Sequence, residues 1–109
     1  MPSVAVAKDK IFQALADPSR RAIFESLTRG EAAVNDLTAR FDISQPAVSQ
    51  HLATLKQAGL VHARREGRRV YYRVAPRGMK PLIDWIAHYR AFWTEHALRL
   101  EELLERMDE

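Results

Sequence analysis

Apolar residues recur every three or four positions along the first half of the chain, which is the spacing of one face of an α-helix. This pattern predicts four short helices, over residues 8–16, 19–28, 33–41 and 44–58. Their apolar faces consist of Ile11, Phe12, Leu15, Ile23, Leu27, Val34, Leu37, Phe41, Val48, Leu52 and Leu55. Four helices that each have one apolar face predict a small helical core.

The ends of these helices are marked by residues suited to helix termini. Asp17 can cap the second helix, and Pro18 fits its first position because proline has no N–H to lose there. Ser44 can cap the fourth helix, and Gly59 can end it in a left-handed conformation. Since only a few residues around Asp42 separate the third helix from the fourth, we predict a helix-turn-helix.

The pattern changes to alternation over residues 61–74. Apolar and polar side chains alternate from Val70 to Val74, as in a half-buried strand, and Glu66-Gly67 supplies a turn. This segment predicts a β-hairpin with an arginine-rich tip. A hairpin directly after a helix-turn-helix is a wing, so we expect a mainly α-helical fold with one small β-hairpin, a winged helix-turn-helix.

The last segment, from about residue 79 to 107, contains neither proline beyond its first turn nor glycine, and its apolar residues follow steps of three, four and seven. We predict one continuous helix of about 28 residues, roughly 42 Å long. A domain this small cannot cover such a helix, so part of its face is expected to pack on a second copy of the chain. The candidate interface residues on this helix are Tyr89, Phe92, Trp93 and Leu100.

The aromatic residues of this candidate interface allow a second interpretation, in which they line a pocket for an effector. Tyr89, Phe92 and Trp93 lie at helical spacing, which is more typical of packed core than of a ligand site. The spacing therefore favours a dimer core.

Length and composition limit the classes of protein. The 109 residues suffice for one domain, residues 1–109, with the C-terminal helix as its dimerisation element. Apolar residues make up 47% of the chain, but no uninterrupted apolar run is long enough to span a membrane, and no signal peptide is recognisable. Without cysteine there are neither disulfides nor thiolate metal sites. We expect a soluble cytoplasmic protein that does not associate with membranes.

Charge is distributed unevenly along the chain. Residues 40–80 hold nine Lys and Arg against two acidic residues, a net charge of +7, whereas the remainder holds eight basic and twelve acidic residues, a net charge of −4. An ordinary solvated surface mixes its signs. Segregation of this kind favours a negatively charged partner, and double-stranded DNA is the first candidate.

The outward face of the fourth predicted helix is polar but uncharged. A solvated helix usually carries Glu and Lys there, whereas Gln and Ser can hydrogen-bond to base edges without repelling phosphates. At the hairpin tip, arginines suit phosphate contacts or insertion into the minor groove. His51 is left open between a phosphate contact and a packing residue. The candidate DNA-binding residues are Gln45, Ala47, Ser49, Gln50, His51, Lys56, Arg65, Arg68 and Arg69.

Three stretches, taken in order, resemble a known family. ALADPSRRAIFESL (residues 14–27), SQPAVSQHLATLKQAGLV (44–61) and RREGRRVYYRV (64–74) are similar to the ArsR/SmtB family of bacterial winged helix-turn-helix repressors. The resemblance spans roughly residues 8–95. It implies a homodimer formed through the first and last helices, which adds Ile11 and Leu15 of the first helix to the candidate interface. It also implies that each fourth helix lies in a major groove and each wing near a minor groove. Many members of the family release DNA when they bind a metal ion.

The chain departs from the metal-sensing patterns of that family. Ala33 and Asn35 stand where arsenic and cadmium sensors carry cysteines, and Ile86 and Arg99 stand where zinc sensors carry ligands on the last helix. We therefore expect a regulator without a cofactor, whose effector is a small molecule, a protein or absent. A metal-responsive alternative would use zinc or nickel ligands from two copies, with the candidates Asp84, His88, Glu95 and His96.

No motif of catalytic chemistry is present. The chain lacks a nucleophile elbow, an HExxH pair, a phosphate-binding glycine loop and cysteine, and its four histidines are scattered. We therefore expect a protein that is not an enzyme. Besides the metal-responsive alternative, one further alternative is a protein-interaction module on the same scaffold, in which Gln50 and the wing arginines are dispensable.

Overall fold

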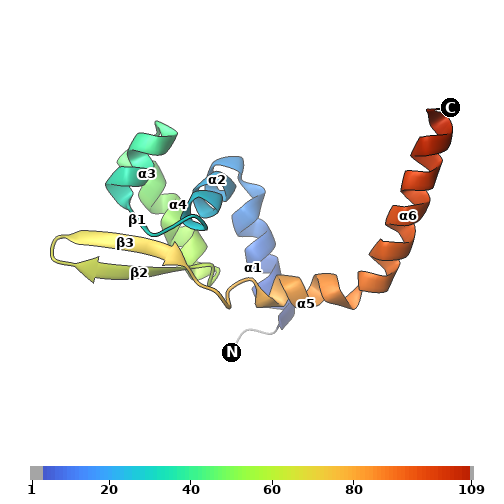
Figure 1. Ribbon diagram of the computed structural model, residues 1–109. Coiled ribbons are helices and arrows are strands. Elements are labelled where there is room, and N and C mark those ends of the chain that lie inside the picture. The colour runs from blue at the N-terminus through green and yellow to red at the C-terminus, as the bar shows by residue number, and fades with distance from the viewer. Residues whose placement is uncertain (1–3, 109) are drawn as a thin grey trace.

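The computed structural model of the protein describes residues 4–108, and its core is a bundle of short helices beside a small antiparallel sheet (Figure 1). The elements in chain order are α1 (Val4–Ala16), α2 (Pro18–Leu27), β1 (Ala32–Ala33), α3 (Val34–Phe41), α4 (Gln45–Gln57), β2 (Val61–Glu66), β3 (Arg69–Val74), α5 (Lys80–His88) and α6 (Arg90–Met107). The predicted mainly helical fold with a wing is confirmed.

Side chains at the helix ends act as the sequence predicts. Asp17 Oδ1 accepts the Arg20 backbone N–H at 2.9 Å and so caps α2. Ser44 Oγ accepts the Ala47 N–H at 3.2 Å and so caps α4. Between α3 and α4, Asp42 adopts a left-handed conformation with φ of 51°, which turns the chain within three residues. These local contacts set the start of α4, whose outward face is the predicted binding surface.

Helix α4 supplies the centre of the core. Val48, Leu52 and Leu55 are fully buried, and α2, α3 and the start of β2 pack around them. The other core residues are Ile11, Ala14, Ile23, Phe24, Leu27, Ala32, Leu37, Leu60 and Val61. Because one face of α4 is buried in this core, the opposite face of the helix is exposed to solvent.

The sheet contains one strand that the sequence pattern does not predict. Strand β1 pairs antiparallel with β3 in the register Ala32↔Tyr72 and Ala33↔Tyr71, so the strand order is β1-β3-β2. A two-residue strand cannot show alternation, and the predicted third helix starts at Ala33, one residue too early. This strand attaches the wing to the chain just before α3.

The wing itself is a hairpin with a two-residue turn. Glu66 pairs with Arg69, so Gly67 and Arg68 form the turn, and Gly67 has a φ of 62°. A positive φ at the first turn residue alone is the pattern of a type II′ turn, whose twist matches the strands on either side. The tip thus presents Arg68 on a tight, regular turn.

Two glycines bring the end of α4 close to the start of α5. Gly59 follows α4 with a φ of 79°, and Gly78 lies just before α5. A Cβ atom placed on Gly78 would lie 2.1 Å from the Gly59 carbonyl oxygen. The two backbones can therefore touch only because residue 78 has no side chain.

The prediction of one continuous C-terminal helix is wrong. The chain breaks at Tyr89 (φ −105°, ψ 14°), where α5 ends and α6 begins. The Tyr89 N–H bonds to the Ile86 carbonyl, three residues back, and this tighter bond ends the α-helical ladder. The ring of Tyr89 packs edge-on against Trp85, with 5.4 Å between centroids. Because the break contains neither glycine nor proline, no helix-breaking residue marks it in the sequence.

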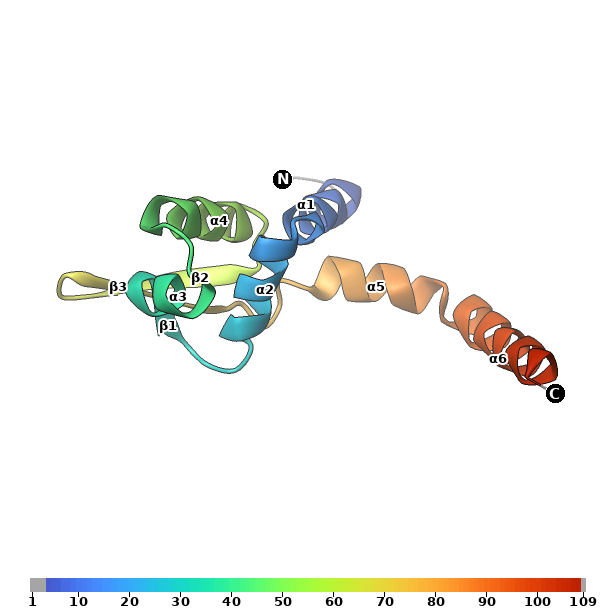
Figure 2. The same cartoon turned by 90° about the horizontal axis from the view of Figure 1, so that it is seen from above.

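Helix α6 projects away from the rest of the protein. Both views show α5 lying against α1, while α6 extends from the end of α5 to the side opposite the wing (Figures 1 and 2). The radius of gyration is 17.8 Å, whereas a compact chain of this length has about 13 Å. Among the described residues, no helix is both long and apolar enough to cross a membrane.

Candidate nucleic-acid interface

The outward face of α4 carries the polar residues that the sequence singles out. Gln45, Ser49 and Gln50 are exposed, and Ala47 is half-buried beside them. Lys56 is exposed in the last turn of the helix. The core-facing side of α4 fixes the helix axis, so this polar face is held rigidly without any of its own side chains being needed for folding.

His51 lies differently from its neighbours on α4. Its ring is half-buried, and its Nδ1 atom is buried without a hydrogen-bond partner in the described part of the chain. The pKa of Asp17 is lowered by the Arg20 N–H that it accepts and also by the nearby His51 ring. His51 therefore lies near the start of α2, and the choice between a phosphate contact and a packing residue stays open.

Three of the wing arginines are free to meet an anion. Arg65, Arg68 and Arg69 are exposed, and among residues 4–108 none of them pairs with a carboxylate. The guanidinium of Arg69 lies 5.8 Å from the centre of the Tyr71 ring, a cation–π distance. The tip of the wing thus carries uncompensated positive charge.

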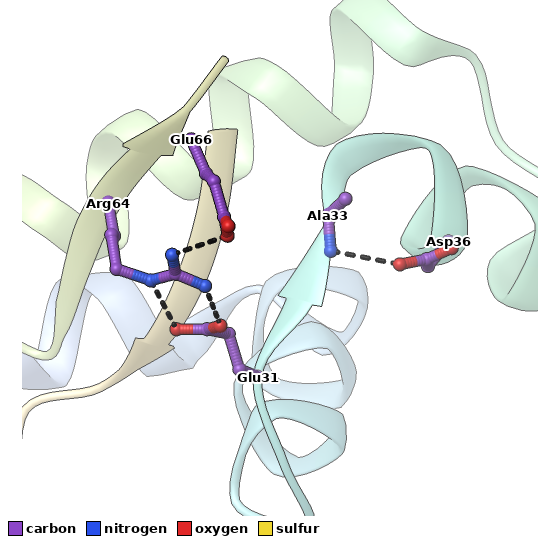
Figure 3. Close-up of polar contacts among 5 residues, drawn as sticks. All are labelled: Glu31, Ala33, Asp36, Arg64 and Glu66. Atoms are coloured by element: carbon purple, nitrogen blue, oxygen red, sulfur yellow. Dashed lines mark hydrogen bonds and ion pairs between the residues drawn. The ribbon is translucent and has the colours of Figure 1, made fainter. Parts of the chain in front are cut away.

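Arg64 has a different role, which Figure 3 shows. Its guanidinium donates to both carboxylate oxygens of Glu31, at 2.5 and 3.3 Å, and to Glu66 at 2.7 Å. It also lies 4.9 Å from the centre of the Tyr71 ring. Because Glu31 precedes β1, these bonds tie the wing to the body of the protein. Nearby, the Asp36 carboxylate accepts the Ala33 N–H at 3.0 Å and fixes the start of α3.

The Arg64–Glu31 contact predicts a pH-dependent contribution to stability. The hydrogen bond from Arg64 lowers the pKa of Glu31 below its ordinary value of 4.5. A lowered folded-state pKa means that the stabilisation is present above pH 4.5 and is lost as the pH falls through the folded-state pKa. We expect Glu31→Gln to lower Tm by no more than a few degrees at pH 7, because the pair is exposed, and by progressively less as the pH falls below 4.5.

Thermal melts of both proteins between pH 3 and pH 7 would measure this difference. Glu101→Gln is the matched control, since Glu101 is exposed on α6 and has no ion pair among the described residues. A Tm difference for Glu31→Gln that stays constant over the whole pH range would contradict the assignment.

The polar face of α4 and the tip of the wing meet at one concave surface. This helix–wing cleft has a volume of about 170 Å³ and is lined by Ala33, Val34, Asn35, Gln45, Arg68, Arg69 and Val70. In Figure 2 the wing extends past the ends of α3 and α4 on the same side of the molecule. Two segments that the sequence predicts separately, the start of α4 and the hairpin tip, are therefore brought together. Asn35 and Glu31 were missed, because neither belongs to the helix or the hairpin that the sequence singles out.

The candidate interface residues fall into two groups. Ile11 is 1% exposed, so it belongs to the core of its own chain and cannot contribute an exposed contact; its prediction as an interface residue is wrong. Leu15 is half-buried against the same core. By contrast, Tyr89, Phe92, Trp93 and Leu100 are each 41–56% exposed.

More apolar side chains are exposed beside them on α1, α5 and α6. They are Phe12, Ile83, Ile86, Leu103, Leu104 and Met107, whereas Leu98 is exposed on another face of α6. At the α5–α6 break, Trp85, Tyr89, Phe92 and Trp93 surround a hollow of about 220 Å³. An exposed apolar surface of this extent indicates a partner for the terminal helices.

The four candidate metal ligands are not gathered within one chain. Asp84 pairs with Lys80 at 2.7 Å, Glu95 pairs with Arg99 at 2.5 Å, and His96 Nδ1 is bonded to the Phe92 carbonyl at 2.8 Å. His88 packs edge-on against Tyr89. Within residues 4–108, no three His, Asp or Glu residues lie close enough together to hold a metal ion.

Comparison with known proteins identifies a family that this chain resembles in sequence. The pattern of the family described as "Bacterial regulatory protein, arsR family" matches residues 17–63. The chain is 41% identical over 97 residues to the HTH-type transcriptional regulator Rv2034 of Mycobacterium tuberculosis, covering 89% of this chain and 88% of that protein. It is 33% identical over 81 residues to the transcriptional repressor SdpR of Bacillus subtilis, covering 74% and 90% of the two chains.

Solved structures agree with the sequence matches. A crystal structure of an ArsR family transcriptional regulator superposes with a TM-score of 0.74 at 31% identity, covering 86% of this chain and 97% of the other. A possible transcriptional regulator for arsenical resistance superposes with a TM-score of 0.67 at 42% identity, covering 84% and 92%. The matched region in these proteins includes the helix-turn-helix, the wing and part of the terminal helices.

Proposed function

This chain belongs to the ArsR family of DNA-binding transcriptional regulators, and from that premise we propose that it is a homodimeric repressor that binds a dyad-symmetric operator. The observation that carries the proposal is the helix–wing cleft, where Gln45 at the start of the uncharged polar face of α4 meets the unpaired arginines of the wing. Helix α4 acts as the recognition helix. Ser49 and Gln50 read base edges in the major groove, with Ala47 near a thymine methyl group, while Gln45 at the start of the helix contacts the backbone.

The second copy is proposed from the terminal helices. Within residues 4–108, α6 packs mainly on α5, and its exposed face carries Trp93, Leu100 and Leu104. A twofold axis through this surface buries the apolar residues of both copies at once. It also presents two copies of α4 to successive major grooves, about 34–36 Å apart, which is why the operator is expected to be symmetric.

Binding is expected to depend steeply on salt. Residues 40–80 carry a net charge of +7 in each copy. If a dimer neutralises about 6–10 phosphates, affinity falls by roughly 10³–10⁵ between 50 and 200 mM salt.

We infer that metal ions do not control this regulator. The chain has no cysteine, and the Asp84 and Glu95 carboxylates already pair with Lys80 and Arg99. An effector, if one exists, is a small molecule or a protein that favours one spacing of the two recognition helices over another. The metal-responsive alternative predicts release of DNA by zinc or nickel and loss of that release in His88→Ala or His96→Ala.

The proposal is tested by selecting a duplex from random DNA and measuring its binding by fluorescence anisotropy, with and without zinc. Gln50→Ala is expected to weaken binding to the selected duplex by roughly 5- to 150-fold, because one bidentate base contact contributes about 1–3 kcal/mol. Preference at one operator position should relax at the same time.

Gln57→Ala serves as the control. Gln57 is an exposed glutamine on the same helix, but it lies at the far end of α4, beside α1. Its replacement should leave the affinity unchanged. If no duplex is enriched by the selection, or if Gln50→Ala binds like the unmodified protein, the protein-interaction alternative is favoured.

A further inference from the structure

The helix–wing cleft is built from three elements that are far apart in the sequence. Ala33 to Asn35 come from the start of α3, Gln45 from the start of α4, and Arg68 to Val70 from the wing. Sequence patterns identify α4 and the wing as two separate contacts with DNA. The cleft joins them into one surface and adds Asn35, which neither pattern includes.

The lining of the cleft is suited to an anion. Arg68 and Arg69 bring two positive charges that no carboxylate neutralises in the described chain, in contrast to Arg64, which is held by Glu31 and Glu66. Asn35 and Gln45 add side-chain amides that can donate hydrogen bonds. The one carboxylate in the first turn of α3, Asp36, is not part of the lining and is bonded to the Ala33 N–H.

The position of the cleft indicates which anion it meets. A recognition helix lies in the major groove and a wing reaches toward the neighbouring minor groove. The sugar–phosphate backbone is the strand that separates these two grooves. A concave surface between helix and wing therefore faces the backbone, and its donors match phosphate oxygens rather than the mixed edges of bases.

We propose that the helix–wing cleft clamps one backbone phosphate of the bound duplex, and that Asn35 is a DNA contact that completes the clamp together with Arg68, Arg69 and Gln45. The proposal rests on the proposed function, in which α4 occupies the major groove. One phosphate would then contact both the start of α4 and the tip of the wing. This shared contact fixes the position of the wing relative to the recognition helix along one DNA strand.

The test uses the full-length dimer and the selected operator, with one phosphate at a time replaced by a neutral methylphosphonate. For the unmodified protein, one position in each half-site should weaken binding by roughly tenfold, as expected for a charge-assisted contact. For Asn35→Ala and Arg69→Gln, binding to the unmodified duplex should be weaker by a similar factor. The same methylphosphonate should then cause a smaller loss than in the unmodified protein, because one of the partners of that phosphate is already gone.

The salt dependence of binding distinguishes the contribution of Arg69 from that of Asn35. Arg69→Gln should reduce the slope of log K against log salt by roughly 0.9 for each clamp, since one neutralised phosphate is lost. Asn35→Ala should weaken binding without changing the slope, because an amide carries no charge. Arg106→Gln is the charge-matched control: Arg106 is exposed at the end of α6, outside the cleft, and its slope should equal that of the unmodified protein.

Three results would overturn the clamp. In the first, Asn35→Ala binds the operator like the unmodified protein. In the second, every methylphosphonate weakens the variants as much as it weakens the unmodified protein. In the third, Arg69→Gln loses binding of inorganic phosphate while its operator affinity and salt slope stay unchanged. The last result would make the cleft a site for a free phosphorylated compound. Failure of the proposed function is recognised separately, because the unmodified protein would then select no duplex at all.

Discussion

Replacing Gly78 with alanine is expected to destabilise the folded chain by about 3 kcal/mol or more, which lowers Tm on the order of 10–20 °C. The added Cβ would lie 2.1 Å from the Gly59 carbonyl oxygen and 3.1 Å from Leu60 Cα, so the obstacle is backbone rather than a side chain that can rotate away. Relief requires moving the start of α5 away from the end of α4. Thermal and denaturant unfolding followed by circular dichroism would measure the loss.

Gly67→Ala is the matched comparison for this variant. Gly67 has a φ of 62° in the wing turn, but nothing lies within 4 Å of an added Cβ. Its replacement should cost only about 1 kcal/mol, the strain of a left-handed alanine. Gly78 itself has no positive φ, so a loss for Gly78→Ala no larger than that for Gly67→Ala would show that the close approach to Gly59 does not make Gly78 necessary.

Replacing Leu100 with glutamate is expected to convert a dimer into a monomer at micromolar concentration. Leu100 is 56% exposed in the single chain, so the change should leave the fold intact. In a symmetric dimer it would bury two unpaired carboxylates, at a cost of several kcal/mol. Operator affinity should fall by about 100-fold or more, because each half-site would then be bound independently.

A nearby leucine offers a sharp control for that experiment. Leu98 is 57% exposed, almost the same fraction as Leu100, but two residues along a helix turn the side chain by about 200°, so Leu98 lies on the opposite face of α6. Leu98→Glu should remain dimeric in sedimentation equilibrium and bind the operator normally. If Leu100→Glu also stays dimeric, the second copy does not pack on this face of α6.

How much of the fold can be predicted from the sequence depends on how local each cause is. The start of α4 is predicted because Ser44 and the stripe of Val48, Leu52 and Leu55 lie within a few residues of one another. Strand β1 and the break at Tyr89 are not predicted. The first depends on pairing with β3, and the second on a single shifted backbone bond.

The same distinction applies to the candidate site. The uncharged face of α4 is visible in the sequence because Gln and Ser are unusual choices for a solvated helix. The sequence does not show that Arg64, unlike the arginines at the wing tip, is held in ion pairs, because its partner Glu31 lies 33 positions away. Nor is the burial of Ile11, whose neighbour Phe12 is 42% exposed on the same helix. Periodicity identifies an apolar face but not which of its residues the chain's own core covers.

The break at Tyr89 has a consequence for how two copies recognise each other. Two straight amphipathic helices can slide past one another by a heptad and still bury leucines against leucines. Here α5 and α6 meet at an angle, so sliding along one segment would pull the other out of contact. For two copies that pair through both α5 and α6, only one alignment brings both segments into contact at the same time. The shape of the backbone would then determine how two copies align, whatever the identity of the apolar side chains on α6.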